Sequence, residues 1–397
     1  MVEYGPLPDD RRSALDAILS YAFSPEDGPL DADEDRETPP QARVGENRAL
    51  LEDGEIRSVC RHIHFDARVR GSDVSMAGLS AVATPPEHRR QGQIGRLLTH
   101  SLREYREWGQ PIAALWPFST PFYAQFGWAT SNHVAVQTGD PDHFRLGDPP
   151  AGRYRRAEKS DWRALDEVLS NHFVSFELAV DRTSEWWHRR TFHAWDTDPY
   201  VYLWERNGDP AGYVRYTVES VGGEKRLEVS ELAYVDPEAR RAMLRFLADH
   251  DSQVAAVRVS GPPTDVLLDR VADPHSLEVS LESGPMVRIV DVVDALSGIS
   301  YPAAVSGTVT VGVEDPLVDW NDDRFTVTFR DGQATVERTG DPADVEGGIG
   351  ALSQLVVGHR TVGDLRRAGD LTVHDEGAGA LLADAFPNST PYIRERF

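Results

Sequence analysis

The sequence predicts a chain of α/β and α+β class, in which two α/β domains of similar layout precede a smaller α+β domain. Its 397 residues suffice for two or three domains. The segment PEHRR at residues 86–90 reappears as PEARR at residues 237–241, and each copy stands between an expected strand and an expected helix. A repeat at the same place in the layout predicts a duplicated domain. From about Val287 the pattern changes to alternating strands followed by short helices.

The chain is strongly acidic. Its 41 basic and 65 acidic residues give a formal net charge of −24. A field of this sign repels phosphate backbones and anionic headgroups, so we expect no nucleic-acid and no membrane partner, whereas a cationic substrate is attracted. Lys159 and Lys225 are the only lysines, and the remaining basic residues are arginine. An acidic surface with almost no lysine resembles the proteins of salt-loving archaea, because concentrated salt screens repulsion between carboxylates.

Cysteine usage and hydropathy indicate the compartment. Cys60 is the only cysteine, so no disulfide forms within one chain. Residues 1–13 contain no apolar signal core, and the uncharged residues 295–313 are interrupted by glycine and proline, which does not suit a membrane-spanning helix. We expect a cytoplasmic protein.

The first domain is expected to span residues 1–150. Residues 9–23 have apolar side chains at helical spacing, and the acidic, proline-rich residues that follow predict a long mobile loop. Two extended runs meet at Asp53-Gly54, a dipeptide that favours a tight hairpin turn. The proline- and glycine-rich residues 139–152 predict the boundary. The other expected elements are a strand at 74–84, a helix from Ile94 that stops at Gly109, a strand at 112–116 and an extended segment at 133–138.

The second domain is expected to span residues 151–286 and the third residues 287–397. In the second, a helix around residues 162–169 precedes two strands that meet at Asn207-Gly208. A further strand at 227–235 leads into the helix that begins in PEARR. The expected elements of the third domain are a strand at 306–313, a hairpin around Asp331-Gly332 and helices at 349–357, 361–368 and 375–385.

The segment most informative about chemistry is RRQGQIG at residues 89–95, between the expected strand and the expected helix. The free N–H groups at a helix N-terminus and the helix dipole favour an anion, and glycine lets the backbone approach a phosphate closely. The segment is neither a Walker loop, since no Gly-Lys-Ser/Thr follows, nor the GxGxxG fingerprint. Two interpretations stay open from the residues alone: a pyrophosphate site, or a glycine turn with surface arginines.

This turn resembles the acetyl-coenzyme A loop of the GNAT acetyltransferase superfamily, whose pattern is Q/R-x-x-G-x-G/A. Arg89, Gly92 and Ile94 take the three fixed places; Ile94 departs from the small final residue, although Gly95 follows directly. The resemblance implies acetyl-CoA as cosubstrate, with its pantetheine arm paired to the strand edge and its pyrophosphate held by amides of the turn. The implied cofactor-binding residues are Val82, Ala83 and Thr84 at the strand edge, Arg89, Arg90, Gln91, Gly92, Gln93, Ile94 and Gly95 in the turn, and Phe118 and Ser119 flanking the arm.

The segment PFYAQFGW at residues 121–128 resembles the part of the family that carries the general-acid tyrosine, which is Tyr123 here. From the residue alone, a packed core aromatic is the other interpretation. The layout of the whole chain resembles the enhanced intracellular survival (Eis-like) acetyltransferases, which join a GNAT domain, a degenerate GNAT domain and a sterol-carrier-like domain. The second copy has no glycine turn, because Arg240-Arg241 runs directly into Ala242-Met243, so we expect one active site per chain.

In that family the terminal carboxylate of the chain acts as general base, which the resemblance assigns to Phe397. A free α-carboxyl group has a pKa of about 3.5 and is a poor base in water. Burial raises such a pKa, and proximity lets the carboxylate take the proton as the amine attacks. A frayed terminus is the alternative, but an aromatic last residue after IRER favours burial.

Other polar clusters carry weaker signals. Cys60 and His62 share a strand face, yet no third orienting group is evident, so a buried structural cysteine is favoured over a nucleophile. His62 and His64 lack a further spaced ligand, so we expect no metal site. Trp186-Trp187 reads as core or as the lining of an acceptor cleft. The acidic residues 27–37 suit either a cationic acceptor or a salt-adapted surface.

The expected function is therefore an N-acetyltransferase that moves an acetyl group from acetyl-CoA to a primary amine of a small cationic molecule. The alternative is a non-catalytic carrier or regulatory protein for lipids or other apolar ligands, with a relic acetyltransferase domain. The resemblance also implies a homo-oligomer.

Overall fold

The computed structural model describes residues 2–30, 38–148 and 150–397, which form two compact units. One unit contains residues 1–37, 45–132 and 285–397, and the other contains residues 38–44 and 133–284. Most of the acidic segment 27–37 lies outside the described residues, since the description resumes at Thr38.

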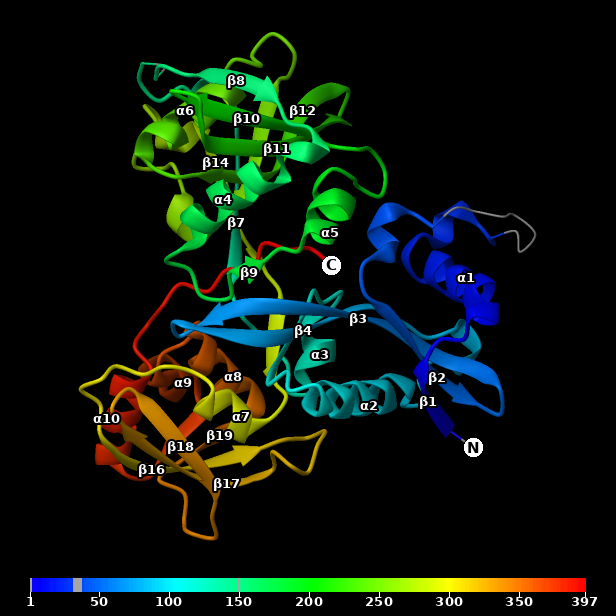
Figure 1. Cartoon of the computed structure of the whole chain (residues 1–397), viewed down its shortest axis with the longest axis vertical. Helices are drawn as coiled ribbons and strands as arrows, with labels where there is room; N and C mark the ends of the chain where they lie inside the picture. The colour runs from blue at the N-terminus through cyan, green and yellow to red at the C-terminus, as the bar shows by residue number, and fades with distance from the viewer. Residues whose placement is uncertain (1, 31–37, 149) are drawn as a thin grey trace. The chain divides into compact units, whose positions relative to one another are not determined.

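The first unit is built on a mixed sheet that pairs neighbouring strands of the N-terminal region (Figure 1). Pairing is antiparallel from β1 to β4, parallel between β4 and β5, and antiparallel beyond β5. In sheet order the strands are β1 (Val2–Pro6), β2 (Glu46–Glu52), β3 (Glu55–Val69), β4 (Ser72–Ala83), β5 (Ile112–Leu115), β15 (Met286–Ile289) and β6 (Ala129–Thr130).

Local sequence signals explain the elements of this region. Asp53 and Gly54 both have positive φ, at 53° and 79°, which makes the tight turn between β2 and β3 that the dipeptide predicts. The expected helices are α1 (Arg12–Phe23) and α2 (Gln93–Glu107), and Gly109 follows the second with φ of 68°. The apolar face of α2 packs with β4 and β5 into a core that includes Leu97, Leu79 and Leu115.

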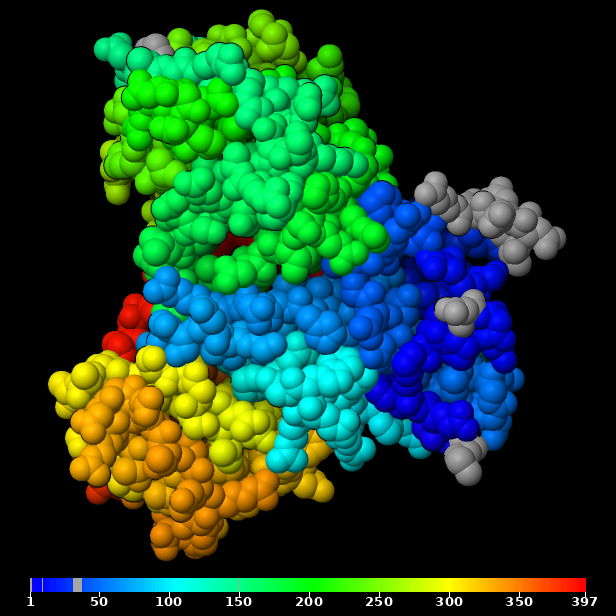
Figure 2. Space-filling view, viewed as in Figure 1, coloured from blue at the N-terminus to red at the C-terminus, as the bar shows by residue number. Residues whose placement is uncertain are grey.

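The C-terminal region belongs to the same unit as the N-terminal sheet. Figure 2 shows its yellow and orange atoms lying directly against the blue and cyan atoms of the N-terminal region. Its own sheet has the order β18 (Gln333–Arg338), β17 (Asp323–Arg330), β16 (Gly307–Glu314), β19 (Val345–Gly348) and β20 (Leu371–Val373). Its helices are α7 (Val292–Ser297), α8 (Ile349–Val357), α9 (Val362–Ala368) and α10 (Glu376–Ala385).

The second unit repeats the layout of the N-terminal region. An antiparallel run of strands leads through one helix, α6 (Pro237–Ala248), to a parallel neighbour, as α2 connects β4 to β5. Its sheet has the order β14 (Glu278–Ser283), β7 (His133–Gly139), β13 (Ala256–Gly261), β12 (Glu224–Tyr234), β11 (Asp209–Val221), β10 (Tyr200–Arg206) and β8 (Arg153–Arg156). The remaining elements are α4 (Trp162–Phe173), β9 (Val180–Asp181) and α5 (Ser184–Trp186).

Two strands cross the predicted domain boundaries, because each pairs with the sheet of a different domain from the one that the sequence predicts for it. β7 precedes the proline-rich segment 139–152 but pairs with β13 and β14, and β15 follows the second repeat but pairs with β5 and β6. The segment 139–152 is itself packed, since Phe144 is fully buried in the core of the second unit. The chain therefore crosses between the two sheets at these strands.

Candidate active site

The first part of the candidate site is the C-terminal end of β4. Pairing between β4 and β5 ends at Leu79 and Leu115, whereas β4 continues to Ala83. In the β3–β4 ladder, Arg61 pairs with Ser80 and Val59 pairs with Ala83, so β4 contains one extra residue there. Ala81 takes the left-handed conformation, with φ of 51°. A bulge of this kind bends a strand, so β4 diverges from β5 and leaves an edge that an extended ligand can pair with.

The three expected edge residues differ in their surroundings. Val82 is half-buried and packs against the core beneath α2, whereas the Ala83 side chain is buried against α1. Ser58 Oγ donates a hydrogen bond to the Ala83 carbonyl at 2.9 Å and lies 3.0 Å from Thr84 Oγ1. Thr84 also accepts a hydrogen bond on its carbonyl from Arg89 Nε at 3.1 Å. These contacts hold the strand end rigidly beside the turn.

The second part is the turn that opens α2. Gly92 is the N-cap residue in the left-handed conformation, with φ of 75°, and no side chain caps the helix. A Cβ built on Gly92 would meet no atom within 4 Å, so open space surrounds it. The first intrahelical bond runs from Arg96 N to Gly92 O, which leaves the amides before Arg96 outside the helical hydrogen-bond pattern. Uncapped amides at a helix N-terminus suit an anion.

The side chains of this turn have distinct contacts. The Arg89 guanidinium lies 5.3 Å from the ring centroid of Tyr21, and Gln91 Nε2 donates to Glu87 O at 3.1 Å. Gln93 is 5% exposed, and its Oε1 has no hydrogen-bond partner among the described residues. A buried acceptor of this kind is costly unless a ligand or water satisfies it.

Gly95 has a packing role that the motif alone does not reveal. A Cβ at this position would lie 3.3 Å from Phe126 Cε1, so the first turn of α2 rests against that ring. Arg90 takes the left-handed conformation, with φ of 57°, and its side chain is exposed. Ile94 is half-buried and packs against the core beneath α2.

The third part follows β5. Phe118 is 75% exposed, and Ser119 is the N-cap of α3 (Thr120–Ala124) without a side-chain capping bond. Tyr123, on α3, is 3% exposed; its ring centroid lies 5.6 Å from that of Phe118 and 5.2 Å from that of Phe122. Burial raises the pKa of Tyr123, so the phenol stays protonated at neutral pH.

The structure brings residues from these three parts to one apolar cluster. Val82 from β4, Ile94 from α2 and Tyr123 from α3 all pack into the core that contains Leu79 and Leu97. Two of the expected cofactor residues, Val82 and Ile94, therefore share one cluster with the expected acid.

The C-terminal segment reaches the same strands, as the red trace in Figure 1 shows. Trp116 Nε1, just after β5, donates to Glu395 O at 2.6 Å, and the Arg396 guanidinium lies 4.9 Å from the Trp116 ring centroid. The Phe397 ring lies 5.0 Å from the Phe65 ring, centroid to centroid. A Cβ on Gly78 of β4 would lie 3.1 Å from Phe397 Cε2, so only glycine leaves room for this ring.

Phe397 and Tyr123 approach the sheet from different faces. Ala77 and Leu79 of β4 point into the cluster that contains Tyr123. Successive strand residues point to opposite faces, so the Gly78 position that contacts Phe397 belongs to the other face. Trp116, whose indole donates to the Glu395 carbonyl, was predicted only as the last residue of the strand at 112–116.

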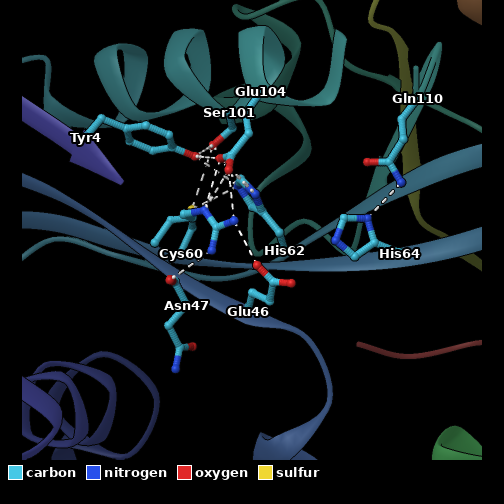
Figure 3. A network of polar contacts seen from close by, with 10 residues as sticks. Tyr4, Glu46, Asn47, Cys60, His62, His64, Ser101, Glu104 and Gln110 are labelled. Atoms are coloured by element: carbon cyan, nitrogen blue, oxygen red, sulfur yellow. Dashed lines mark hydrogen bonds and ion pairs between the residues drawn. The ribbon is translucent and has the colours of Figure 1, made fainter. Parts of the chain in front are cut away.

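A separate polar network lies between β1, β3 and α2 (Figure 3). His62 Nε2 lies 3.5 Å from Cys60 Sγ and 3.0 Å from Ser101 Oγ, and Tyr4 donates to Glu104 at 2.9 Å. Ser101 and Glu104 supply the orienting groups that the sequence did not reveal. Burial nevertheless raises the pKa of Cys60 to about 12 and lowers the pKa of His62 to about 3. A protonated thiol beside a neutral imidazole is unreactive, which supports the structural interpretation.

The remaining polar candidates are also structural. Gln110 Nε2 lies 3.0 Å from His64 Nδ1, away from Cys60. In the described residues, no three His, Cys, Asp or Glu side chains are grouped to hold a metal ion. Trp186 and Trp187 are buried, and Trp187 Nε1 donates to Asp166 at 2.9 Å. None of the helices in the described ranges is long and apolar enough to cross a membrane.

The helix in the second unit that matches α2 has a different N-terminus. Asp236 is the N-cap of α6, and its carboxylate accepts a hydrogen bond from Ala239 N at 2.8 Å. Arg206 pairs with Asp236 at 2.6 Å and with Glu238 at 2.5 Å. The anion position of this repeat is therefore filled by the chain's own carboxylate.

Comparison with known domain families agrees with this architecture. Acetyltransferase (GNAT) domain families match residues 3–131 and residues 178–289, and the sterol carrier protein domain family matches residues 292–394. This order confirms the predicted succession of two acetyltransferase-like domains and a sterol-carrier-like domain.

Relatives are similar over most of the chain. An uncharacterised N-acetyltransferase of Streptomyces avermitilis is 27% identical over 345 residues, which cover 82% of this chain and 83% of that protein. N-acetyltransferase Eis of Mycobacterium tuberculosis is 27% identical over 334 residues, or 79% of each chain.

Solved structures share the fold. A GCN5-related N-acetyltransferase of Anabaena variabilis has a TM-score of 0.86 at 22% identity, with full coverage of both chains. Eis1 of Mycobacterium abscessus has a TM-score of 0.77 at 22% identity, also with full coverage of both chains. The domain matches, their order and the named relatives together identify an acetyl-transferring enzyme built from two GNAT domains followed by a sterol carrier protein domain.

Proposed function

We propose that the chain is an N-acetyltransferase that transfers the acetyl group of acetyl-CoA directly to a primary amine of a small cationic acceptor. The catalytic site lies within residues 1–150, residues 151–286 contain a degenerate repeat, and residues 287–397 supply the terminal carboxylate. The observation that carries the proposal is the convergence of the uncapped glycine turn, the diverging strand end and Tyr123 on one cluster.

Binding of acetyl-CoA follows from the open helix N-terminus. The amides of residues 90–95 hold the pyrophosphate, and the open space at Gly92 lets phosphate oxygens approach the backbone. The edge of β4 from Val82 to Thr84 pairs with the pantetheine arm, with Phe118 and Ser119 on its other side. The unsatisfied Gln93 Oε1 supports a polar ligand at this helix start.

The reaction uses groups at the divergence of β4 from β5. The amine nitrogen attacks the thioester carbonyl and loses its proton to the Phe397 carboxylate. A strand amide near Val82 to Thr84 stabilises the oxyanion. As the carbon–sulfur bond breaks, the thiolate takes the proton of the Tyr123 hydroxyl.

The position of the Phe397 ring supports the proposal that the terminal carboxylate is the general base. Its ring is held at Gly78 and Phe65 while Trp116 holds the backbone two residues earlier. In this proposal, base and acid act from the two faces of the sheet, next to the point where pairing between β4 and β5 ends.

The acceptor class follows from electrostatics. The net charge of −24 attracts cationic amines and repels anionic ones. We propose polyamine-like or aminoglycoside-like amines as the class, a homo-oligomer as the assembly and concentrated salt as the working medium. The repeat in residues 151–286 does not bind acetyl-CoA, because Asp236 occupies its helix N-terminus.

The test combines thiol release with matched tyrosine variants. A panel of cationic amines is expected to release CoA thiol from acetyl-CoA, and Tyr123→Phe is expected to lower kcat by about 10²-fold without changing the KM for acetyl-CoA. Tyr105→Phe is the control, since Tyr105 is equally buried on α2 and its hydroxyl has no hydrogen-bond partner among the described side chains and backbone.

A second arm tests the base. A chain extended by two glycines after Phe397 keeps the aromatic ring and moves the carboxylate, so its kcat should fall by at least tenfold. Unchanged turnover in the extended chain would remove Phe397 from the mechanism, and unchanged turnover in Tyr123→Phe would remove the acid. Stabilisation by lipid but not by acetyl-CoA would support the non-catalytic carrier instead.

A further inference from the structure

The segment that carries Tyr123 is anchored to a buried ion pair. The short helix α3 ends in a turn in which Phe126 N and Trp128 N both donate to Tyr123 O, at 3.0 and 3.3 Å. The carbonyl of Phe126 accepts a hydrogen bond from Arg288 Nη1 on β15. Arg288 thus reaches a main-chain group three residues beyond Tyr123, although 162 residues separate it from Phe126 in sequence.

The second terminal nitrogen of Arg288, Nη2, binds the C-terminal region. Arg288 Nη2 donates to Asp315 Oδ1 at 2.6 Å and to Oδ2 at 2.5 Å, and both side chains are 0% exposed. Asp315 Oδ1 also accepts from Leu317 N at 2.9 Å, and Asn321 Nδ2 donates to Oδ2 at 3.1 Å. The guanidinium orientation is therefore set by a loop that follows β16.

Arg288 and α8 pack so closely against the turn after Tyr123 that only glycine fits at position 127. Its φ is 80°, and a Cβ there would collide with Arg288 Nη1 and Ile349 Cγ2. Gln354 of α8 donates to Thr130 O at 2.9 Å, so α8 also holds the chain after the turn. The turn after Tyr123 therefore packs between the buried Arg288 guanidinium and α8.

The turn that follows Tyr123 also contacts α2, the helix that begins at the glycine turn of residues 89–95. The Phe126 ring lies against Gly95 in the first turn of α2, while its carbonyl is held by Arg288. Residue 126 therefore connects the proposed pyrophosphate turn, the Tyr123 helix and the C-terminal region through one backbone position.

We propose that Arg288 and Asp315 form a positioning pair for Tyr123, through which the sterol-carrier-like domain sets the placement of the phenol. The proposal rests on the proposed function for the role of Tyr123. Arg288 acts through the Phe126 carbonyl and touches no reacting atom. The pair is buried, and it is bonded to the Phe126 carbonyl of the turn and to Leu317 N and Asn321 Nδ2 of the loop, so movement of the C-terminal region is transmitted to the acid.

The test replaces the pair by apolar residues. Buried ion pairs exchanged for apolar residues of similar volume commonly retain the fold, so Arg288→Met combined with Asp315→Leu is expected to fold and to leave the Phe126 carbonyl without its donor. We expect kcat to fall at least tenfold. In the Tyr123→Phe background the same replacement should lower kcat by less than twofold further, because the acid it positions is already absent.

A matched control separates positioning from loss of structure. Ser353 Oγ accepts a hydrogen bond from Ile289 N at 2.9 Å and donates to Ile349 O at 2.6 Å. It therefore joins the same strand and helix, and neither of these two hydrogen bonds involves the turn. Ser353→Ala should leave kcat within twofold. An equal loss of kcat in Ser353→Ala and in the double replacement would overturn the proposal.

A readout besides activity keeps the two proposals distinguishable. With 3-fluorotyrosine at position 123, the ¹⁹F resonance should shift or broaden when the pair is replaced and stay in place in Ser353→Ala. An unmoved resonance with unchanged kcat overturns the positioning role even if Tyr123→Phe is inactive. A moved resonance while Tyr123→Phe retains full turnover overturns the acid role of Tyr123 but keeps the positioning of its ring.

Discussion

The two repeats differ at the N-cap of one helix, and this difference can be transferred to the catalytic domain. In α2 the N-cap is Gly92 with no capping side chain, whereas in α6 the Asp236 carboxylate caps the helix itself. We predict that Gly92→Asp weakens the binding of acetyl-CoA. The matched control is Gly92→Asn, because Asn and Asp tolerate the left-handed conformation similarly and differ in charge.

The magnitude follows from the surroundings of Gly92. Nothing lies within 4 Å of a Cβ there, so the Cβ of either variant has room, and the cost of a left-handed side chain is common to both. Two unit charges 4 Å apart repel by about 1 kcal/mol in water and about 4 kcal/mol at an effective dielectric of 20. Since Gly92 is exposed, we take about 1–3 kcal/mol for the carboxylate against one phosphate, which is roughly 5- to 150-fold in Kd.

The assay is calorimetric titration with acetyl-CoA at two salt concentrations. Gly92→Asp should bind roughly 5- to 150-fold more weakly than Gly92→Asn at 0.1 M salt. The difference should shrink at 1 M salt, where the Debye length falls to about 3 Å. Equal affinities of the two variants at low salt would refute the placement of the pyrophosphate at this helix N-terminus.

Three further perturbations test the position of the Phe397 ring, the burial of His62 and the effect of the net charge. Gly78→Ala places a Cβ 2.6 Å from Phe65 Cε2 and 3.1 Å from Phe397 Cε2, so it should displace the terminal ring and lower kcat about tenfold. Gly5→Ala is the control, because a Cβ at residue 5 meets no atom within 4 Å and kcat should not change. Equal kcat values in the two variants would contradict the position of the Phe397 ring. The lowered pKa of His62 means that the unfolded chain binds one more proton between pH 6.5 and about 3. Urea titrations should therefore show the free energy of unfolding falling by about 1.4 kcal/mol per pH unit as pH drops through that window, and His62→Gln should lose this slope. The net charge of −24 predicts that Tm rises between 0.1 and 2 M KCl, and a flat Tm would argue against salt adaptation.

Local patterns predicted most of the elements correctly. The Asp53-Gly54 turn, the start of α2 within a residue of Ile94, and α8 at residues 349–357 all depend on residues within one or two turns of each other. Backbone preference and the spacing of apolar side chains act over that range, so they can be read without the fold. The glycine turn and the segment around Tyr123 likewise stand in continuous sequence, which is why the resemblance could be seen.

Contacts between residues distant in sequence could not be predicted from such local patterns. The sequence showed a strand near residues 133–138 but not that β7 pairs in the second sheet, nor that β15 returns to β5. Edge complementarity and burial choose the neighbour of a strand, and its own alternation does not specify it. Likewise no pattern around Gly78 indicates an aromatic ring from the chain end.

By itself, the sequence determined the acidic, lysine-poor composition and the succession of three domains, and its motifs predicted the residues of one acetyltransferase-like site. Only the tertiary structure decided that Trp116 holds Glu395, 279 residues away, and that Arg288 holds the turn after Tyr123. The physical reason is the range of the interactions. Helical and strand periodicity depends on neighbours along the chain, whereas a buried donor finds its acceptor only after the sheets and the C-terminal region have packed together.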